Sequence, residues 1–94
     1  MVLRDYDRAI ALAPDFACAY YNRANVRCSR QDFKAALVDY TAAIERNPDF
    51  AEAYYNRGLV YIYLGRNDEG IADLSKAGEL GIVAAYNVIK RLSD

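Results

Sequence analysis

The sequence repeats itself at a spacing of 34 residues, and this period constrains the fold more than any other feature. Residues 15–26 read Asp-Phe-Ala-Cys-Ala-Tyr-Tyr-Asn-Arg-Ala-Asn-Val, and residues 49–60 read Asp-Phe-Ala-Glu-Ala-Tyr-Tyr-Asn-Arg-Gly-Leu-Val. Nine of these twelve positions are identical. A fixed period of this size indicates stacked supersecondary units, each too small to bury its apolar face alone.

Each period divides into two predicted helices. Apolar residues recur at helical spacing after each polar start, and the residues expected to cap or begin helices are Asp15, Asp32, Asp49 and Asn67. Pro48 should end one second helix, because the residue before a proline disfavours helical geometry. Gly65 should end the first helix of the next period.

Small residues recur where the two helices of a unit would cross. They occupy equivalent positions one period apart, namely Ala24 and Gly58, Ala36 and Gly70, and Ala43 and Ala77. Helix axes about 8–10 Å apart require small side chains at the contact. We therefore interpret these residues as packing positions rather than as generic helix formers.

The two ends of the chain continue the pattern incompletely. Residues 2–13 resemble the second helix of a unit whose first helix is absent. This match rests on Val2, Tyr6, Ala9, Ile10 and Pro14, which align with Ala36, Tyr40, Ala43, Ile44 and Pro48. Residues 82–93 have the apolar spacing of an amphipathic capping helix. The prediction is one all-α domain, residues 1–94, with repeats at 15–48 and 49–81, about six helices and no sheet.

Composition excludes several classes of function. Twelve basic and thirteen acidic residues alternate in sign, so we expect no nucleic-acid partner. The chain has no histidine and no glycine-rich phosphate loop. We therefore expect no enzymatic activity, no cofactor and no metal site. No apolar run is long enough to cross a bilayer.

The two cysteines cannot form a disulfide with each other. Cys18 and Cys28 lie ten residues apart on one predicted helix, which places them ~15 Å apart along its axis. A disulfide requires Cα atoms about 4.4–6.8 Å apart. Free thiols indicate a reducing compartment, so the expected location is cytoplasmic.

The residues that recur at the 34-residue period resemble the pattern of the tetratricopeptide repeat. The resemblance covers nearly the whole chain. The family pattern is carried by Tyr20, Ala24, Ala36, Tyr40, Ala43 and Pro48 in the first repeat, and by Tyr54, Gly58, Tyr61, Gly70, Leu74 and Ala77 in the second. The resemblance implies an α-α superhelix of stacked antiparallel helix pairs. Departures from the pattern occur at Arg27, Asn67, Gly78 and Ile82. Three of them fall in the final repeat, whose second helix should end early.

The resemblance also implies a concave groove, lined by the first helix of each pair, that binds an extended peptide or a partner helix. The residues it assigns to the groove are Tyr21, Asn22, Asn25, Ser29, Tyr55, Asn56, Leu59 and Tyr63, with Cys18, Cys28, Glu52 and Ile62 beside them. An asparagine amide both donates and accepts hydrogen bonds, so it can pair with a peptide backbone. The alternative is that the asparagines form hydrogen bonds between helices. Tyr20 and Tyr54 are predicted core residues, whereas Tyr21 and Tyr55 should face the groove.

Some members of the family clamp a carboxy-terminal carboxylate with groove-facing lysine and arginine beside such asparagines. Here the preceding positions are Tyr21 and Tyr55, which supply no charge-assisted hydrogen bond. The expected function is therefore a non-catalytic module that binds a protein or peptide partner, within a larger protein of this family. The alternative is a structural segment that self-associates through the open helix face of residues 2–13.

A second periodic pattern places Arg23 and Arg57 with Asp5, Asp39 and Asp73. These side chains could contact a polar ligand, but bidentate pairs between neighbouring helices are the favoured interpretation. Arg57→Ala should therefore lower the melting temperature more than it lowers affinity for a partner. Thermal unfolding and a binding titration on the same variant measure both effects. An unchanged melting temperature would contradict the structural role.

Overall fold

The computed structural model describes residues 16–93. The chain divides into two compact units, residues 1–48 and 49–94. Residues 16–93 form five helices and no strand, rather than the six helices expected for the whole chain. The expected helix at residues 2–13 lies outside the described residues.

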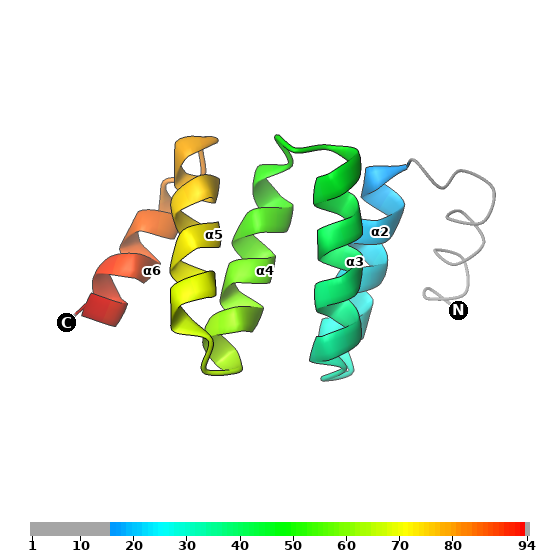
Figure 1. Cartoon of the computed structure of the whole chain (residues 1–94), viewed down its shortest axis with the longest axis horizontal. Helices are drawn as coiled ribbons and strands as arrows, with labels where there is room; N and C mark the ends of the chain where they lie inside the picture. The colour runs from blue at the N-terminus through cyan, green and yellow to red at the C-terminus, as the bar shows by residue number, and fades with distance from the viewer. Residues whose placement is uncertain (1–15, 94) are drawn as a thin grey trace. The chain divides into compact units, whose positions relative to one another are not determined.

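Each unit is built on an antiparallel helix pair (Figure 1). Unit 1 contains α2 (Ala17–Ser29) and α3 (Phe33–Arg46). Unit 2 contains α4 (Ala51–Tyr63), α5 (Asn67–Glu79) and α6 (Ala84–Ser93), with α6 packed against α5. The equivalent helices of the two units follow the 34-residue period, and the all-α prediction is confirmed.

Most helix ends lie within one residue of the prediction. Asp32 is the N-cap of α3, and Asn47 before Pro48 is extended, as expected. The N-caps of α4 and α5 are Phe50 and Arg66, so the predictions of Asp49 as the cap and of Asn67 as the cap were wrong by one residue. Their carbonyls accept the first helical hydrogen bonds, from Tyr54 N and Gly70 N respectively. Asp15 lies outside the described residues, and α2 has Phe16 as its N-cap.

Three turns between helices share one hydrogen-bond pattern. In the turn after α4, Gly65 N donates to the Ile62 carbonyl and Arg66 N donates to the Tyr61 carbonyl, which is a Schellman motif. Gly65 has φ +82°, a left-handed conformation that favours glycine. The same position in unit 1 is Gln31, with φ +64°. Gln31 therefore holds, with a Cβ and hence under strain, the left-handed conformation that Gly65 adopts freely.

The helices of unit 2 cross at a pair of glycines. A Cβ on Gly70 would lie 2.9 Å from the Gly58 carbonyl oxygen and 2.5 Å from Ile62 Cδ1. All six predicted crossing residues are buried, which confirms their packing role. Ile62 and Gly70 correspond to Cys28 and Ala36 in unit 1. In unit 2 the larger Ile62 therefore packs against Gly70, which has no Cβ. Unit 1 has the smaller Cys28 and an alanine at these two positions.

Both predicted Arg–Asp pairs join the two helices of a unit. Arg23 donates to Asp39 through Nε at 2.8 Å and Nη2 at 2.7 Å. Arg57 donates to Asp73 in the same way, at 2.7 and 2.8 Å. The aspartates are only 2% and 6% exposed. Loss of one partner from a buried pair leaves an uncompensated charge and costs about 3–5 kcal/mol, which supports a structural role.

The last helix covers the apolar side of α5. Leu74 and Ala77 of α5 and Ala85 of α6 are fully buried, and Val88 and Ile89 pack against them. The ring of Tyr86 occupies the space that a Cβ on Gly78 would need, at 2.5 Å. This contact explains why the family's aliphatic residue is absent at Gly78. As expected, the second helix of unit 2 ends early. Helix α5 ends at Glu79, one residue before the position that aligns with the end of α3 at Arg46.

Gly70→Ala should lower the free energy of unfolding by about 1 kcal/mol. Overlap with Ile62 and with the Gly58 carbonyl costs about 1–3 kcal/mol and exceeds the gain of up to ~1 kcal/mol in helix propensity. Ile62→Cys recreates the combination found in unit 1. Urea denaturation should show the double variant less destabilised than the sum of the single variants. Additive effects would contradict the steric account.

Gln31→Gly should raise the free energy of unfolding by about 0.5–1 kcal/mol, because glycine adopts the left-handed conformation without a Cβ clash. The matched control is Gly65→Ala, which introduces that clash in unit 2 and should lower stability by about 1 kcal/mol. Both are measured by urea denaturation. A stability loss in Gln31→Gly would show that the glutamine side chain matters more than the backbone strain.

Candidate functional site

The eight predicted groove residues occupy one face of each first helix. Spacings of three and four residues keep them on one side of the helix. Tyr21, Asn22, Asn25 and Ser29 lie on α2, and Tyr55, Asn56, Leu59 and Tyr63 lie on α4. Because α2 and α4 belong to different units, each set forms a candidate surface of its own, here called the α2 face and the α4 face.

The α2 face is tied to α3 by Tyr40. The Tyr40 hydroxyl donates to Asn25 Oδ1 at 2.5 Å, and Cys28 Sγ lies 3.6 Å from the same hydroxyl oxygen. Since the single phenolic proton goes to Asn25, the Cys28 thiol is the donor to Tyr40. The ring of Tyr40 also lies 5.9 Å from the ring of Tyr21, centroid to centroid. Asn25 and Cys28 thus hold the helix pair together, which was the alternative considered for the asparagines.

The two cysteines differ in exposure. Both are free, as the helix geometry predicted. Cys18 is exposed at the start of α2. Burial raises the pKa of the Cys28 thiol above its ordinary value, and the contact with Tyr40 offsets part of this rise. Cys28 therefore remains a neutral thiol at neutral pH and serves as a hydrogen-bond donor rather than as a nucleophile.

Asn22 remains available on the α2 face. It is half-buried and makes no hydrogen bond with another described residue. Ser29 is exposed, but its hydroxyl donates to the Val26 carbonyl of its own helix at 2.6 Å. The polar capacity of this face toward a partner is therefore concentrated at Asn22.

The α4 face is more apolar than the α2 face at equivalent positions. Asn25 and Ser29 are replaced by Leu59 and Tyr63, which are 37% and 70% exposed and lie one turn apart. Tyr55 is half-buried and contacts the Leu74–Ala77–Ala85 cluster. The α4 face therefore offers apolar and aromatic contact area on a rigid helix.

Arginines and tyrosines alternate along the side of α4 that carries the Arg57–Asp73 pair. The Arg57 guanidinium carbon lies 5.8 Å from the Tyr54 ring centroid and 5.7 Å from that of Tyr61. The Arg66 guanidinium carbon lies 4.8 Å from the Tyr61 ring centroid, and Arg66 forms an ion pair with Glu69. The hydrogen bonds to Asp73 raise the pKa of the Arg57 guanidinium, so its charge persists at all relevant pH values. These contacts indicate that Arg57 has a structural role in the helix pair.

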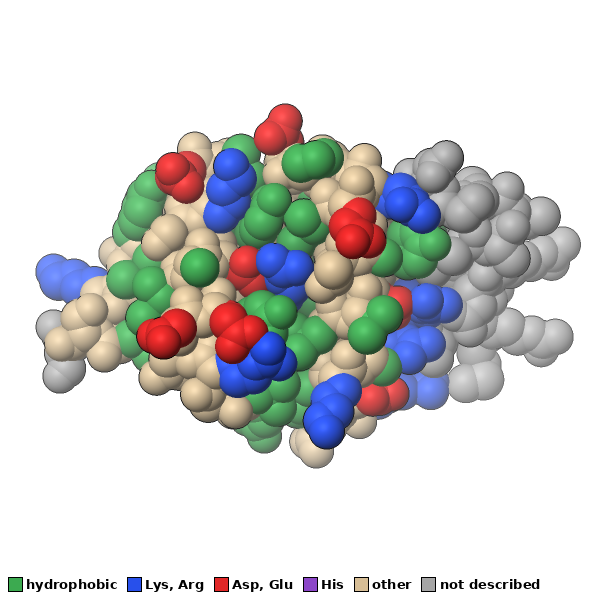
Figure 2. Space-filling model, in the orientation of Figure 1, with side chains coloured by type: hydrophobic (Ala, Val, Ile, Leu, Met, Phe, Trp, Pro, Cys, Tyr) green, Lys and Arg blue, Asp and Glu red, His purple; other side chains and the backbone are tan. Residues whose placement is uncertain are grey.

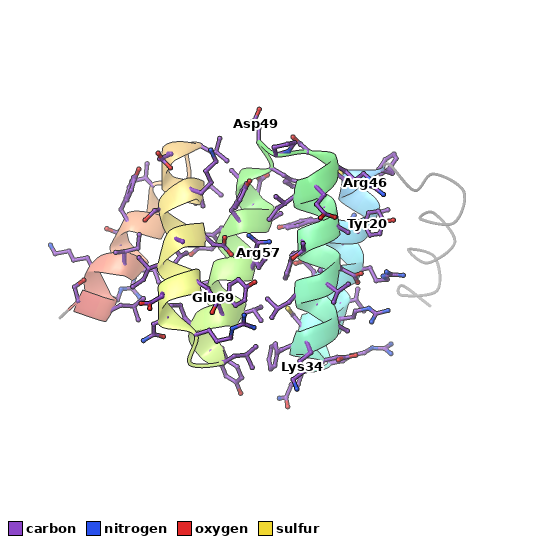
Figure 3. The ribbon with its side chains drawn as sticks, viewed as in Figure 1. Tyr20, Lys34, Arg46, Asp49, Arg57 and Glu69 are labelled. Atoms are coloured by element: carbon purple, nitrogen blue, oxygen red, sulfur yellow. The ribbon has the colours of Figure 1, made fainter. Side chains whose placement is uncertain are left out.

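Unit 1 has a second arginine beside its buried aspartate. Arg27, which occupies the position of Tyr61, places Nε 3.1 Å from Asp39 Oδ2 without hydrogen-bond geometry. Tyr20 lies beside Arg46, whose guanidinium carbon is 5.8 Å from the ring centroid (Figure 3). Tyr20 is half-buried, and Tyr54 contacts the core of unit 2. Arg27, which departs from the family pattern, therefore gives Asp39 a second arginine partner.

Two negative findings bear on function. Residues 16–93 contain no group of three or more Cys, Asp or Glu side chains placed to hold a metal ion. None of the described helices is long and apolar enough to cross a membrane. Figure 2 shows charged side chains of both signs scattered among apolar ones on the face it presents.

Sequence reasoning did not identify Tyr40 as the residue that organises the α2 face. The signal available was the difference between repeats: Tyr40 aligns with Leu74, Cys28 with Ile62, and Asn25 with Leu59. Three polar residues in one unit against three aliphatic residues in the other indicate a buried hydrogen-bond cluster. Periodicity alone does not reveal it, because both residue types suit a helix.

Two family models match the chain. One described as "TPR repeat" matches residues 24–65, and one described as "Tetratricopeptide repeat" matches residues 51–80. Together they cover residues 24–80, from the middle of α2 to the end of α5. A comparison with curated protein sequences finds no match.

Solved structures show the same fold. MamA is similar with a TM-score of 0.85 and 28% identity, over 89% of this chain and 50% of MamA, so the chain spans half of that protein. The TPR2B domain of yeast Sti1, in a complex with pHsp70, has a TM-score of 0.80 and 28% identity over 83% of this chain and 62% of that one. The first TPR of Spaghetti (RPAP3), bound to the HSP90 peptide SRMEEVD, has a TM-score of 0.91 and 24% identity over 97% and 74%.

Proposed function

Because the chain belongs to the tetratricopeptide repeat family, we propose that it is a non-catalytic module that binds a peptide or a partner helix. Proteins of this family are in general interaction modules without catalytic activity. The observation that supports the proposal most is the exposure of Leu59 and Tyr63 together on α4. Apolar and aromatic side chains adjacent on a rigid helix are typical anchors for a partner.

The α2 face offers hydrogen bonding instead. Asn22 has an unused donor and acceptor with respect to the described residues, and it can pair with a peptide unit of any sequence. Asn25 is committed to Tyr40 and contributes less than the sequence suggested. A partner at the α2 face should therefore make backbone hydrogen bonds with Asn22, and a partner at the α4 face should place an apolar side chain against Leu59 and Tyr63.

The chemistry of the faces disfavours a strongly acidic partner. None of the eight predicted groove residues carries a charge. The peptide bound by Spaghetti, SRMEEVD, contains three carboxylate side chains, and a buried carboxylate requires charge-assisted hydrogen bonds. In this chain, Tyr21 and Tyr55 offer none. We infer an uncharged, apolar recognition segment.

The test is a selection of displayed random peptides on the 94-residue chain, followed by calorimetric titration of the enriched peptide. Leu59→Asp should weaken a peptide that binds the α4 face at least about tenfold, and Asn22→Ala should weaken a peptide that binds the α2 face by a similar factor. The matched control is Val38→Asp, because Val38 is 68% exposed on α3 and lies on neither face. Thermal unfolding of every variant separates lost binding from lost folding.

Two results would contradict the proposal. One is an enriched peptide whose affinity is unchanged by Leu59→Asp but reduced by Val38→Asp, since the partner would then bind α3. The other is that SRMEEVD binds more tightly than the enriched apolar peptide. That outcome would show that carboxylates are recognised despite the uncharged faces.

A further inference from the structure

Helix α4 exposes three side chains, and they lie along one side of it. They are Glu52, Leu59 and Tyr63, and every other residue of α4 is buried or half-buried. Their spacings of seven and four residues correspond to about two turns and about one turn of helix, so they follow one line along the surface. Glu52 thus lies at the edge of the α4 face, about 10 Å from Leu59 along the helix axis.

The Glu52 carboxylate has no basic partner among residues 16–93, with none of which it forms an ion pair. It lies in the first turn of α4, where the helix dipole favours an acidic residue. The equivalent residue of unit 1 is Cys18, so a first helix forms without a carboxylate at this position. Glu52 is therefore an exposed negative charge next to an apolar surface, and it attracts a basic group of a partner.

The α4 face has few groups that can hydrogen-bond to a peptide backbone. Leu59 and Tyr63 stand where unit 1 has Asn25 and Ser29. Asn56 is half-buried and already engaged in an interaction within the chain. The polar groups that this face offers a partner are therefore mainly tyrosine hydroxyls.

An extended peptide on such a face would leave much of its backbone unpaired. From Glu52 to Tyr63, α4 extends over about 16 Å, a distance that an extended strand covers with about five residues and about ten backbone donors and acceptors. Buried backbone groups need hydrogen-bond partners, and a helix provides them from its own residues. A helical occupant therefore loses less when it is buried against Leu59 and Tyr63 than an extended one does.

We propose that the occupant of the α4 face is an amphipathic helix of a partner protein, antiparallel to α4, with a lysine or arginine that pairs with Glu52. This inference rests on the proposed function, because it requires that Leu59 and Tyr63 bind a partner. In the antiparallel orientation, the basic residue lies toward the C-terminus of the partner helix, where the helix dipole favours a cation. The partner's residues i and i+4 meet Tyr63 and Leu59, and its basic residue follows at about i+11. The apolar segment inferred above is thus followed by a positive charge about two turns farther along the helix.

The test is a second selection on the 94-residue chain, from displayed alanine-rich helical peptides of about 18 residues with randomised surface positions. Enriched peptides should carry two apolar residues four positions apart and a basic residue about seven positions farther. A proline on the solvent side of the peptide, midway between these residues, breaks the helix and should weaken binding at least about tenfold. Leu59→Asp should weaken the same peptide by a similar factor. Calorimetric titration measures both effects.

A charge exchange tests the pairing with Glu52. Glu52→Lys should weaken the enriched peptide about three- to tenfold at low salt, and less at high salt because the pair is exposed and screened. A peptide with glutamate in place of its basic residue should bind Glu52→Lys more tightly than it binds the wild-type chain. The matched control is Glu79→Lys, the same charge change at an exposed position of α5, which should leave affinity nearly unchanged.

Thermal unfolding establishes that each variant is folded, because Glu52→Lys also places a cation in the first turn of α4. If that variant is unstable, Glu52→Gln replaces it. This change removes the charge without reversing it, and it should weaken the enriched peptide about two- to threefold.

Two outcomes would overturn this inference and leave the proposed function standing. One is that the peptides weakened by Leu59→Asp tolerate the proline, because the occupant would then be extended. The other is that helical peptides bind through Leu59 but lack a basic residue, or bind Glu52→Lys and Glu79→Lys equally well. If neither selection yields a peptide that Leu59→Asp weakens, the α4 face binds no partner and both proposals fail there.

Discussion

The close crossing of two helices within each unit is the constraint on which the other features depend. Small residues at the crossing let the backbones approach until the Gly58 carbonyl would touch a Cβ on Gly70. At that separation, the arginine of the first helix can reach the aspartate of the second in bidentate geometry. The aspartate is buried by the same packing, and the arginine compensates for the desolvation of its charge. Steric fit and ion pairing are therefore two results of one geometry.

The repeats differ where side chains project from that common frame. In unit 1, the Tyr40 hydroxyl is buried with its ring and needs a partner, so Asn25 and Cys28 are drawn into hydrogen bonds with it. In unit 2, Leu74 has no polar atom, so Ile62 fills the space beside Gly70 and Leu59 turns apolar surface outward. A change at one core position thus alters which residues of the neighbouring face are available to a partner. The same scaffold consequently presents a polar face on α2 and an apolar face on α4.

This division of roles accounts for the functional interpretation. The arginines of α2 and α4 are held by aspartates and tyrosines, which removes them from the list of ligand-binding groups. What remains on the candidate faces is an amide, tyrosine rings and a leucine, a combination suited to backbone hydrogen bonds and apolar anchoring.

The sequence by itself determined the helix pairs, the start of each paired helix to within one residue, the crossing positions and the two Arg–Asp pairs that lie within residues 16–93. These follow from the 34-residue period, because residues repeated at one register in a helical array have equivalent neighbours. The sequence did not determine which asparagine is free to bind a partner. Asn22 and Asn25 lie one turn apart with the same hydrogen-bonding capacity, and only the position of Tyr40 on α3 separates their roles. Nor did it show that Tyr86 fills the space above Gly78. Such assignments depend on contacts between helices, and a periodic pattern gives the face of a residue but not the side chain that meets it.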